Sequence, residues 1–275
     1  MQNPHNFTVP QLIEMSKELR RDIVKMVHAA GSGHPGGSLS AVELMAVLYF
    51  SVMHYDPKDV SNPERDYFIL SKGHVTPIYY SALAEAGFFD KEILWTFRNL
   101  GSPLQGHPGK GKVPGIEVGA GSLGQGLSIA SGVALATKVN HKENKVFCLL
   151  GDGELQEGQI WGAIMTAAHY KLDNLIALVD YNNLQIDGTC EEVMGIAPLK
   201  EKWEAFNWHV VECDGHDIED VLRAYAKATS FVGKPSVIIA KTHKGKGISY
   251  MEDVAGWHGK APSDEELKLA LEELA

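Results

Sequence analysis

Two polar segments have residue types suited to holding a metal ion and a diphosphate. Residues 151–153 have the sequence Gly-Asp-Gly and directly follow an apolar run, and Asn182 comes two residues after the next apolar run. Two glycines let the backbone turn tightly and approach a phosphate closely. A carboxylate and an amide oxygen are hard donors for Mg²⁺ or Ca²⁺, and Mg²⁺ takes one or two carboxylates together with phosphate oxygens. One Asp, one Asn and a diphosphate fit that pattern.

The apolar runs and the segment between them predict a strand, a helix and a second strand. Residues 145–150 and 174–180 are short and apolar, as expected of strands buried on both faces, and 154–170 has apolar residues at helical spacing. They form a predicted right-handed βαβ unit. Asp152 and Asn182 then lie beyond the carboxyl ends of neighbouring strands, where open α/β sheets bind ligands, and should meet in space. The alternative is an ordinary βα turn and a polar strand exit.

The remaining sequence predicts one doubly wound, mostly parallel α/β domain over residues 1–275, flanked by helices. The segment 100–121 is dense in Gly and Pro, and loops this long are uncommon unless they serve a site. The helix 40–55 is apolar on all sides and should be buried. Further helices are predicted at 9–30, 76–86, 91–99, 123–139, 218–229 and 263–275, and further strands at 67–70, 209–212 and 235–240.

Composition indicates an ordinary globular protein and excludes several classes. The chain has 275 residues, 44% of them hydrophobic and 22% charged, with a net charge of −10 that argues against nonspecific nucleic-acid binding. Its three cysteines form no CxxC pair, so neither a disulfide scaffold nor a zinc ribbon is indicated, and Cys148 is expected in the core. No apolar run approaches the roughly 18 residues of a membrane span, and the first residues lack the form of a signal peptide. We expect a cytoplasmic protein without membrane contact.

Three other features bear on the site. Residues 119–124 satisfy GxGxxG, but a Pro- and Gly-broken segment precedes them instead of a strand, which argues against a dinucleotide site. Four histidines stand in glycine-rich turns, where catalytic groups concentrate, and no pair has the HxxxH spacing of a zinc site. The basic segment 241–247 follows the last strand and is either a solvated loop or part of the site. Lys244 is its main candidate, followed by His243 and Lys246.

The motifs resemble those of transketolases. GDGELQEG at 151–158 and NLIALVDYNNLQIDG at 174–188 resemble the thiamine diphosphate signature of that family, and GSLGQG at 121–126 resembles a segment that lines the cofactor. SGHPG, KGH, GHP and WHG occur in the family's order. The resemblance covers nearly the whole chain but only the diphosphate-binding half of the family. It implies the thiamine diphosphate-binding fold, with thiamine diphosphate and Mg²⁺ or Ca²⁺ as cofactors.

The resemblance also implies a role for each matching residue. His34, His107 and His258 are the catalytic residues, which hydrogen-bond the sugar hydroxyls and assist proton transfer. The metal ligands are Asp152, Asn182 and the backbone carbonyl of Leu184. The cofactor-binding set is His74, Gly121, Leu123, Gly151, Asp152, Gly153, Glu157, Asn182, Ile186, Lys244 and His258.

Two departures from the family pattern shape the expected assembly. Glu157 matches a glutamate between two cofactor sites, but Gly162 replaces a second glutamate, which puts carboxylate coupling between sites in doubt. The family's cofactor-activating glutamate lies in a downstream domain, and this sequence ends at Ala275. We therefore expect the N-terminal subunit of a split transketolase, completed by a C-terminal subunit with the pyrimidine-binding domain in an α2β2 heterotetramer.

The expected reaction is transfer of a two-carbon ketol unit from a ketose phosphate to an aldose phosphate, as in the pentose phosphate pathway. Two alternatives stay open. One is a subunit of another thiamine diphosphate enzyme, similar to 1-deoxyxylulose-5-phosphate synthase. The other is a non-catalytic cofactor-binding subunit.

Overall fold

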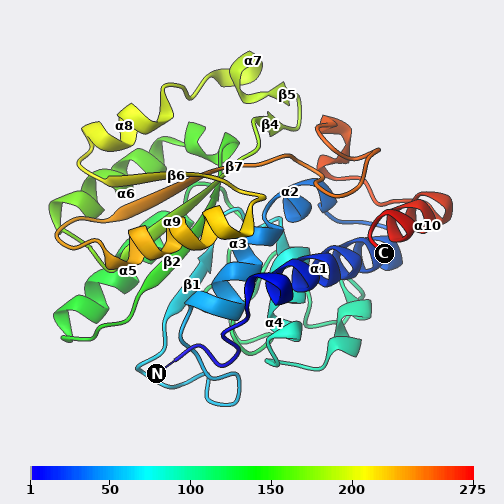
Figure 1. Ribbon diagram of the computed structural model, residues 1–275, viewed down its shortest axis with the longest axis horizontal. Coiled ribbons are helices and arrows are strands. Elements are labelled where there is room, and N and C mark those ends of the chain that lie inside the picture. Colours follow the sequence, from blue (N-terminus) through cyan, green and yellow to red (C-terminus); the bar gives the residue numbers. More distant parts are fainter. Residues whose placement is uncertain (1) are drawn as a thin grey trace.

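Strands in the middle of the molecule form one parallel sheet. The computed structural model describes residues 2–275, and within them a five-stranded sheet has the order β1-β2-β3-β7-β6. Helices lie on both sides of this sheet (Figure 1). The strands are β1 (Tyr67–Leu70), β2 (Val146–Gly151), β3 (Leu175–Tyr181), β6 (His209–Asp214) and β7 (Ser236–Lys241). The prediction of a doubly wound parallel sheet is confirmed.

Alternating strand residues enter two separate cores. In β2, Phe147 and Leu149 face one core, whereas Cys148 and Leu150 face the other. This period of two, with apolar residues on both sides, is the pattern of a strand covered on both faces. The first core includes α1 (Val9–Ala30), α3 (Val42–Val47), α4 (Thr76–Glu85), α9 (Ile218–Ser230) and α10 (Asp264–Glu273); the second includes α5 (Gly126–Val139), α6 (Gly158–His169) and α8 (Leu199–Ala205).

The predicted helix 40–55 is wrong as a single helix, although most of its residues are buried as expected. Helix α2 (Pro35–Ser40) begins five residues earlier, because proline lacks an N–H and suits the first helical turn. The backbone at Ala41 leaves the helical region with φ −95° and ψ 7°, which separates α2 from α3. A π-helical turn, η1 (Leu48–Val52), then ends the segment.

Three other predicted helices are shorter because the backbone leaves the helical region. The predicted helix 123–139 begins only at Gly126, since Gly124 has φ +84°. The predicted helix 154–170 is divided at Glu157, whose extended backbone separates the 3-10 turn η3 (Gly153–Gln156) from α6. Segment 91–99 forms only a 3-10 helix, η2 (Lys91–Thr96).

Several short elements were not predicted. Residues 184–189 form a hairpin of β4 (Leu184–Gln185) and β5 (Gly188–Thr189), followed by α7 (Cys190–Met194), and η4 (Ala255–His258) carries a site histidine. The segment 100–121 contains neither helix nor strand, as predicted, and no strand directly precedes the GxGxxG residues. Among the described residues, none of the helices is long and apolar enough to cross a membrane.

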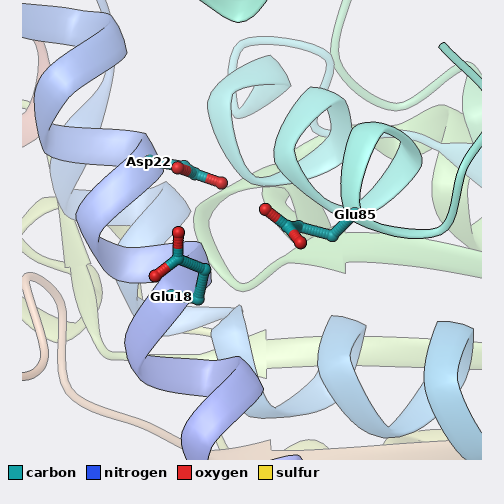
Figure 2. A group of neighbouring side chains, drawn as sticks. All are labelled: Glu18, Asp22 and Glu85. Carbon is teal, nitrogen blue, oxygen red and sulfur yellow. The ribbon is translucent and has the colours of Figure 1, made fainter. Parts of the chain in front are cut away.

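Three carboxylates meet where α1 and α4 pack. Glu18 and Asp22 from α1 and Glu85 from α4 point toward one another (Figure 2), with carboxylate oxygens within 4.8 Å. The ammonium of Lys91 lies 2.5 Å from Glu18, 2.9 Å from Asp22 and 2.5 Å from Glu85. Lys91 therefore already supplies the positive charge for this cluster and ties η2 to both helices.

Candidate functional site

A cavity of about 400 Å³ lies beyond the carboxyl ends of the central strands. Loops that follow β1, β2, β3 and β7 contribute to its wall, together with α2, η4 and the Gly-rich segment before α5. All the predicted catalytic, cofactor-binding and metal-binding residues line it: His34, His74, His107, Gly121, Leu123, Gly151, Asp152, Gly153, Glu157, Asn182, Leu184, Ile186, Lys244 and His258. The wall also includes Gly37, Lys72, Glu154, Gln156 and Gln185.

A larger cavity, of about 590 Å³, lies elsewhere and contains none of the predicted residues. It adjoins Tyr67, where β1 begins, and so lies at the opposite edge of the sheet. Arg65 and Glu117 in its wall already pair with each other. Because ligands of open α/β sheets bind at the carboxyl ends of strands, the smaller cavity is the better candidate.

Local hydrogen bonds fix the orientation of the candidate metal ligands. Asp152 is 2% exposed; one carboxylate oxygen accepts from the Gly153 N–H at 2.7 Å and the other from the Asn183 N–H. The amide oxygen of Asn182 accepts from the Leu184 N–H at 3.1 Å. These bonds form because β2 and β3 are neighbours in register, with Gly151 opposite Asp180.

The chemistry of this site fits a divalent cation. Burial, together with the nearby Asp180, raises the pKa of Asp152 to about 6, so a cation beside it would stabilise the ionised form. The Leu184 carbonyl accepts from the ammonium of Lys244 at 3.0 Å, which shows that this oxygen already faces a positive charge. Hard carboxylate and carbonyl oxygens are the ligands that Mg²⁺ and Ca²⁺ prefer.

A buried ion pair lies beneath the candidate metal ligands. Lys72 and Asp180 have side chains 3% and 0% exposed and pair with each other, and Lys72 also donates to the Gly37 carbonyl at 3.1 Å. Burial alone raises the pKa of Asp180, but Lys72 and the hydroxyls of Ser40 and Thr242 lower it below its usual range. The side-chain N–H of Asn182 donates to Asp180 at 3.2 Å. The pair therefore helps to orient Asn182.

Glu154 joins three segments of the wall. Its carboxylate accepts from the Ser71 hydroxyl at 2.5 Å, the Gly124 N–H at 2.9 Å and the Gly151 N–H at 3.1 Å. The side chain is 3% exposed, so these bonds are shielded from water. Glu154 thus holds the Gly-rich segment against the turns that follow β1 and β2.

The site histidines form a cluster whose rings are held neutral. The ring of His34 lies 5.1 Å from that of His74 and 5.4 Å from that of His258, and the last two stack at 5.1 Å. Burial lowers the pKa of His34 to about 4 and that of His258 to about 3, helped by Arg98 and Lys244 respectively. Burial also lowers the pKa of His74 and His107. Neutral imidazoles can both donate and accept hydrogen bonds.

Lys244 is aimed into the cavity by two contacts. Its ammonium donates to the Leu184 carbonyl and to Nδ1 of His258, each at 3.0 Å, so His258 carries its proton on Nε2. Burial lowers the pKa of Lys244 to about 8. His243 and Lys246 do not line the cavity; they pair with Asp253 at 2.9 Å and Glu252 at 3.5 Å.

Two predicted residues lie in open parts of the site. Ile186 is 67% exposed at the hairpin tip, and Glu157 is exposed at the start of α6. A Cβ atom added to Gly162 would meet nothing within 4 Å, so no neighbour within the described chain requires a glycine there. The structure therefore places Ile186 and Glu157 at the rim of the cavity, whereas Gly162 lies on α6 and does not line it.

A family profile described as "Transketolase, thiamine diphosphate binding domain" matches residues 11–275. The chain belongs to the transketolase family. It is 46% identical over 273 residues to one of the subunits of the apulose-4-phosphate transketolase of Actinobacillus succinogenes, and the match covers 99% of each chain. It is 44% identical over 256 residues to a 6-deoxy-6-sulfo-D-fructose transketolase subunit of Clostridium sp., and that match covers 93% of each.

Whole transketolases are longer than this chain. Transketolase of Homo sapiens is 43% identical over 258 residues, which cover 94% of this chain but 41% of that protein. The crystal structure of Campylobacter jejuni transketolase superposes with a TM-score of 0.90 at 34% identity and covers 98% of this chain but 43% of that one. This chain therefore spans less than half of these transketolases.

Sequence reasoning missed some of the buried polar groups that support the candidate site. Lys72 and Glu154 lie inside the KGH and GDGELQEG motifs, so their place in those motifs was a signal that could have found them. Asp180 lies within an apolar strand, where a charged residue at the carboxyl end was the available signal. Each acts through contacts with distant residues, which spacing along the chain does not reveal.

Proposed function

We propose that this chain is the N-terminal subunit of a two-chain transketolase. It would transfer a two-carbon ketol unit from a ketose phosphate to an aldose phosphate. The observation that carries the proposal is the convergence of four histidines with Asp152, Asn182 and Lys244 on one cavity. The family match and the relatives named as transketolase subunits support it.

The wall offers a place for each part of the cofactor. Asp152, Asn182 and the carbonyl of Leu184 are proposed to hold Mg²⁺ or Ca²⁺, which would bind the diphosphate. Lys244 would neutralise further phosphate charge. The glycines and rim residues of the predicted set, with His74, would contact the diphosphate and the rings. Thiamine diphosphate, when bound, supplies the electron sink for cleavage beside a carbonyl.

The histidines are proposed to handle the sugar. His34, His107 and His258 face one cavity, and their lowered pKa values keep them neutral at pH 7. A neutral imidazole can hold a hydroxyl and exchange a proton with it. Because Lys244 donates to Nδ1 of His258, the Nε2–H of His258 is left to donate to the donor sugar.

The partner is proposed to be a C-terminal subunit with the pyrimidine-binding domain, in an α2β2 assembly. It would supply the carboxylate that hydrogen-bonds the aminopyrimidine ring. Support comes from the Actinobacillus relative, which is named as a subunit of a transketolase. This chain and that subunit match over nearly the whole length of both. The single-domain boundary at 1–275, the pentose phosphate pathway and a cytoplasmic location stay predictions.

Reconstitution tests the proposal. The purified chain, its candidate partner, thiamine diphosphate and Mg²⁺ are mixed, and ketol transfer between sugar phosphates is measured. We expect transfer only with both chains present. Full activity of this chain alone would contradict the two-subunit assignment.

Two further measurements separate the alternatives. A substrate profile in which pyruvate replaces the ketose donor would indicate an enzyme similar to 1-deoxyxylulose-5-phosphate synthase. Full activity of His34→Ala and His258→Ala in the reconstituted complex would indicate a cofactor-binding subunit without a catalytic role. We expect both substitutions to reduce transfer by about 100-fold.

A further inference from the structure

A buried chain of polar contacts connects the protein core to the loop that carries Lys244. Arg20 from α1 and Glu43 from α3 pair at 2.6 Å, and both are 6% exposed. Nδ1 of His216, which lies between β6 and α9, contacts the same carboxylate at 2.9 Å. None of these residues lines the candidate site cavity.

Both ends of this chain of contacts hold the backbone of loop 242–247. Nε2 of His216 accepts from the His243 N–H at 2.8 Å. Nε of Arg20 donates to the Lys246 carbonyl at 2.9 Å. The residues on either side of Lys244 thus have one backbone N–H and one carbonyl fixed by side chains from other elements.

The hydrogen bonds determine the tautomer of His216. Because Nε2 accepts from a backbone N–H, it carries no proton, and the proton of the neutral ring lies on Nδ1. Nδ1 therefore donates to Glu43, whose carboxylate also pairs with Arg20. Arg20 and Glu43 balance each other's charge. Glu43 fixes the orientation of the His216 ring, and the ring in turn holds the His243 N–H of the loop.

The geometry of the loop leaves little room for another arrangement. The Gly245 N–H donates to the Gly36 carbonyl at 3.0 Å, and the Asp253 N–H donates to the Lys244 carbonyl at 2.8 Å. Gly247 has φ +94°, and a Cβ there would lie 2.8 Å from Arg20. The guanidinium therefore packs directly against the loop.

We propose that Arg20, Glu43 and His216 form a positioning network that keeps the ammonium of Lys244 directed into the cavity. Compared with apolar residues of similar size, a buried ion pair adds little net stability. Its directed bonds instead fix the backbone on both sides of Lys244. Only one part of this proposal rests on the proposed function, namely that Lys244 binds the diphosphate in the cavity.

Hydrogen exchange measures the hold on the loop without any partner or cofactor. In the full chain, His216→Ala removes the acceptor for the His243 N–H, so we expect this amide to exchange about tenfold faster. His216→Gln retains a carbonyl acceptor and an N–H donor, and we expect it to restore slow exchange. The matched control is His209→Gln, because His209 lies on β6 and stacks on Phe231 at 3.9 Å, away from the loop.

A second measurement connects the loop to the site. We expect His216→Ala to bind thiamine diphosphate in the presence of Mg²⁺ about tenfold more weakly, and His216→Gln to recover affinity. Glu43→Gln, which removes the charge that orients the ring, should fall between them. Urea unfolding of each variant separates a local change from general destabilisation.

These measurements decide whether the network positions the loop that carries Lys244 or only stabilises the fold in general. Unchanged exchange at His243 in His216→Ala overturns the network. Faster exchange that glutamine does not rescue, or that His209→Gln reproduces, reduces its role to general stability and also overturns the proposal. If the unmodified chain binds no thiamine diphosphate, the proposed function fails, whereas the exchange data still decide whether the network holds the loop.

Discussion

Two regions of this protein bring lysines and carboxylates together, and they use the charges differently. Lys91 contacts all three carboxylates of the cluster in Figure 2, namely Glu18, Asp22 and Glu85. Its positive charge is therefore paired within the fold. In the candidate site, Lys244 donates to a carbonyl and an imidazole and has no carboxylate within ion-pair distance among residues 2–275.

The pKa values of the two lysines shift in opposite directions. Burial lowers the pKa of Lys91, but three carboxylates outweigh it and raise the value above the usual range. Burial lowers the pKa of Lys244 to about 8, because the attraction of Asp152 does not offset it. A desolvated charge without a counter-ion in the fold indicates a ligand site, whereas a satisfied one indicates structure.

The comparison also separates two kinds of metal pattern. Three acidic side chains within 4.8 Å of one another have the composition of a cation site, yet a lysine already fills their centre. The candidate site has one carboxylate and one amide, Asp152 and Asn182, at the edge of the sheet. The number of acidic groups is therefore a poorer guide than whether a cation of the protein already lies between them.

The largest expected effect is at Asp152. Asp152→Asn keeps the shape of the side chain but removes the only charge among the proposed metal ligands. We expect affinity for thiamine diphosphate in the presence of Mg²⁺ to fall by about 100-fold, or about 2.7 kcal/mol. Isothermal titration of the full chain measures this.

Glu85→Gln is the matched control, because it alters a carboxylate that Lys91 already pairs. Its affinity should equal that of the unmodified chain. If Glu85→Gln weakened binding as much as Asp152→Asn, the division between structural and ligand-binding charges would be wrong.

The next effect is on stability. Lys91→Met leaves three carboxylates without their shared cation, one of them fully buried. We expect unfolding free energy to fall by about 2 kcal/mol, less than for a wholly buried pair because Lys91 is 33% exposed. Tm should fall by roughly 5 °C. Urea unfolding and calorimetry measure this, and cofactor affinity of the folded protein should not change.

The reverse result is expected at Lys244. Lys244→Met removes a buried ammonium that has no counter-ion, so stability should stay constant or rise. Affinity for thiamine diphosphate should fall by about tenfold, because phosphate charge loses a partner. The pair Lys91→Met and Lys244→Met thus forms a crossed test; loss of stability in both would mean that Lys244 also serves mainly to hold the fold.

Sequence patterns predicted those parts of the molecule that follow local rules. Apolar runs marked the strands, since a parallel strand buried on both faces needs continuous apolar residues. The polar segments after β2 and β3 placed Asp152 and Asn182 together because parallel strands end at one edge. The motif glycines and histidines then completed the cavity wall, which the structure brings together in full.

What the sequence missed depends on contacts between distant residues. Lys72 and Asp180 are 108 positions apart, and no periodicity relates them. The need for a glycine at the first residue of α5 comes from Ser71, whose Cβ would lie 2.4 Å from a Cβ at Gly126. Lys91 gave no pattern either, because its three partners come from two other helices. Such features follow from tertiary packing and not from propensity.

The smallest expected effect is the pH dependence that the cluster adds to stability. Burial raises the pKa of Asp22 to about 7, although Lys91 lowers it in part. The pKa of an Asp in an unfolded chain is about 4. Since the folded protein holds this proton more tightly, the contribution of Asp22 is fully present below about pH 4 and is lost as pH rises through about 7.

Asp22→Asn removes this pH dependence, because asparagine is neutral like the protonated Asp22 and does not titrate. We expect the variant to match the unmodified chain near pH 4 and to be more stable at pH 8, by a few degrees in Tm, measured by calorimetry across that range. Asp173 supplies the opposite sign: Lys138 and the Gly233 N–H outweigh burial and lower its pKa, so Asp173→Asn should cost stability at pH 8 instead. If Tm changed with pH in the same way in Asp22→Asn and in the unmodified chain, the prediction would be wrong. Lys91 would then keep Asp22 ionised across this pH range, and the cluster would be a permanent salt bridge.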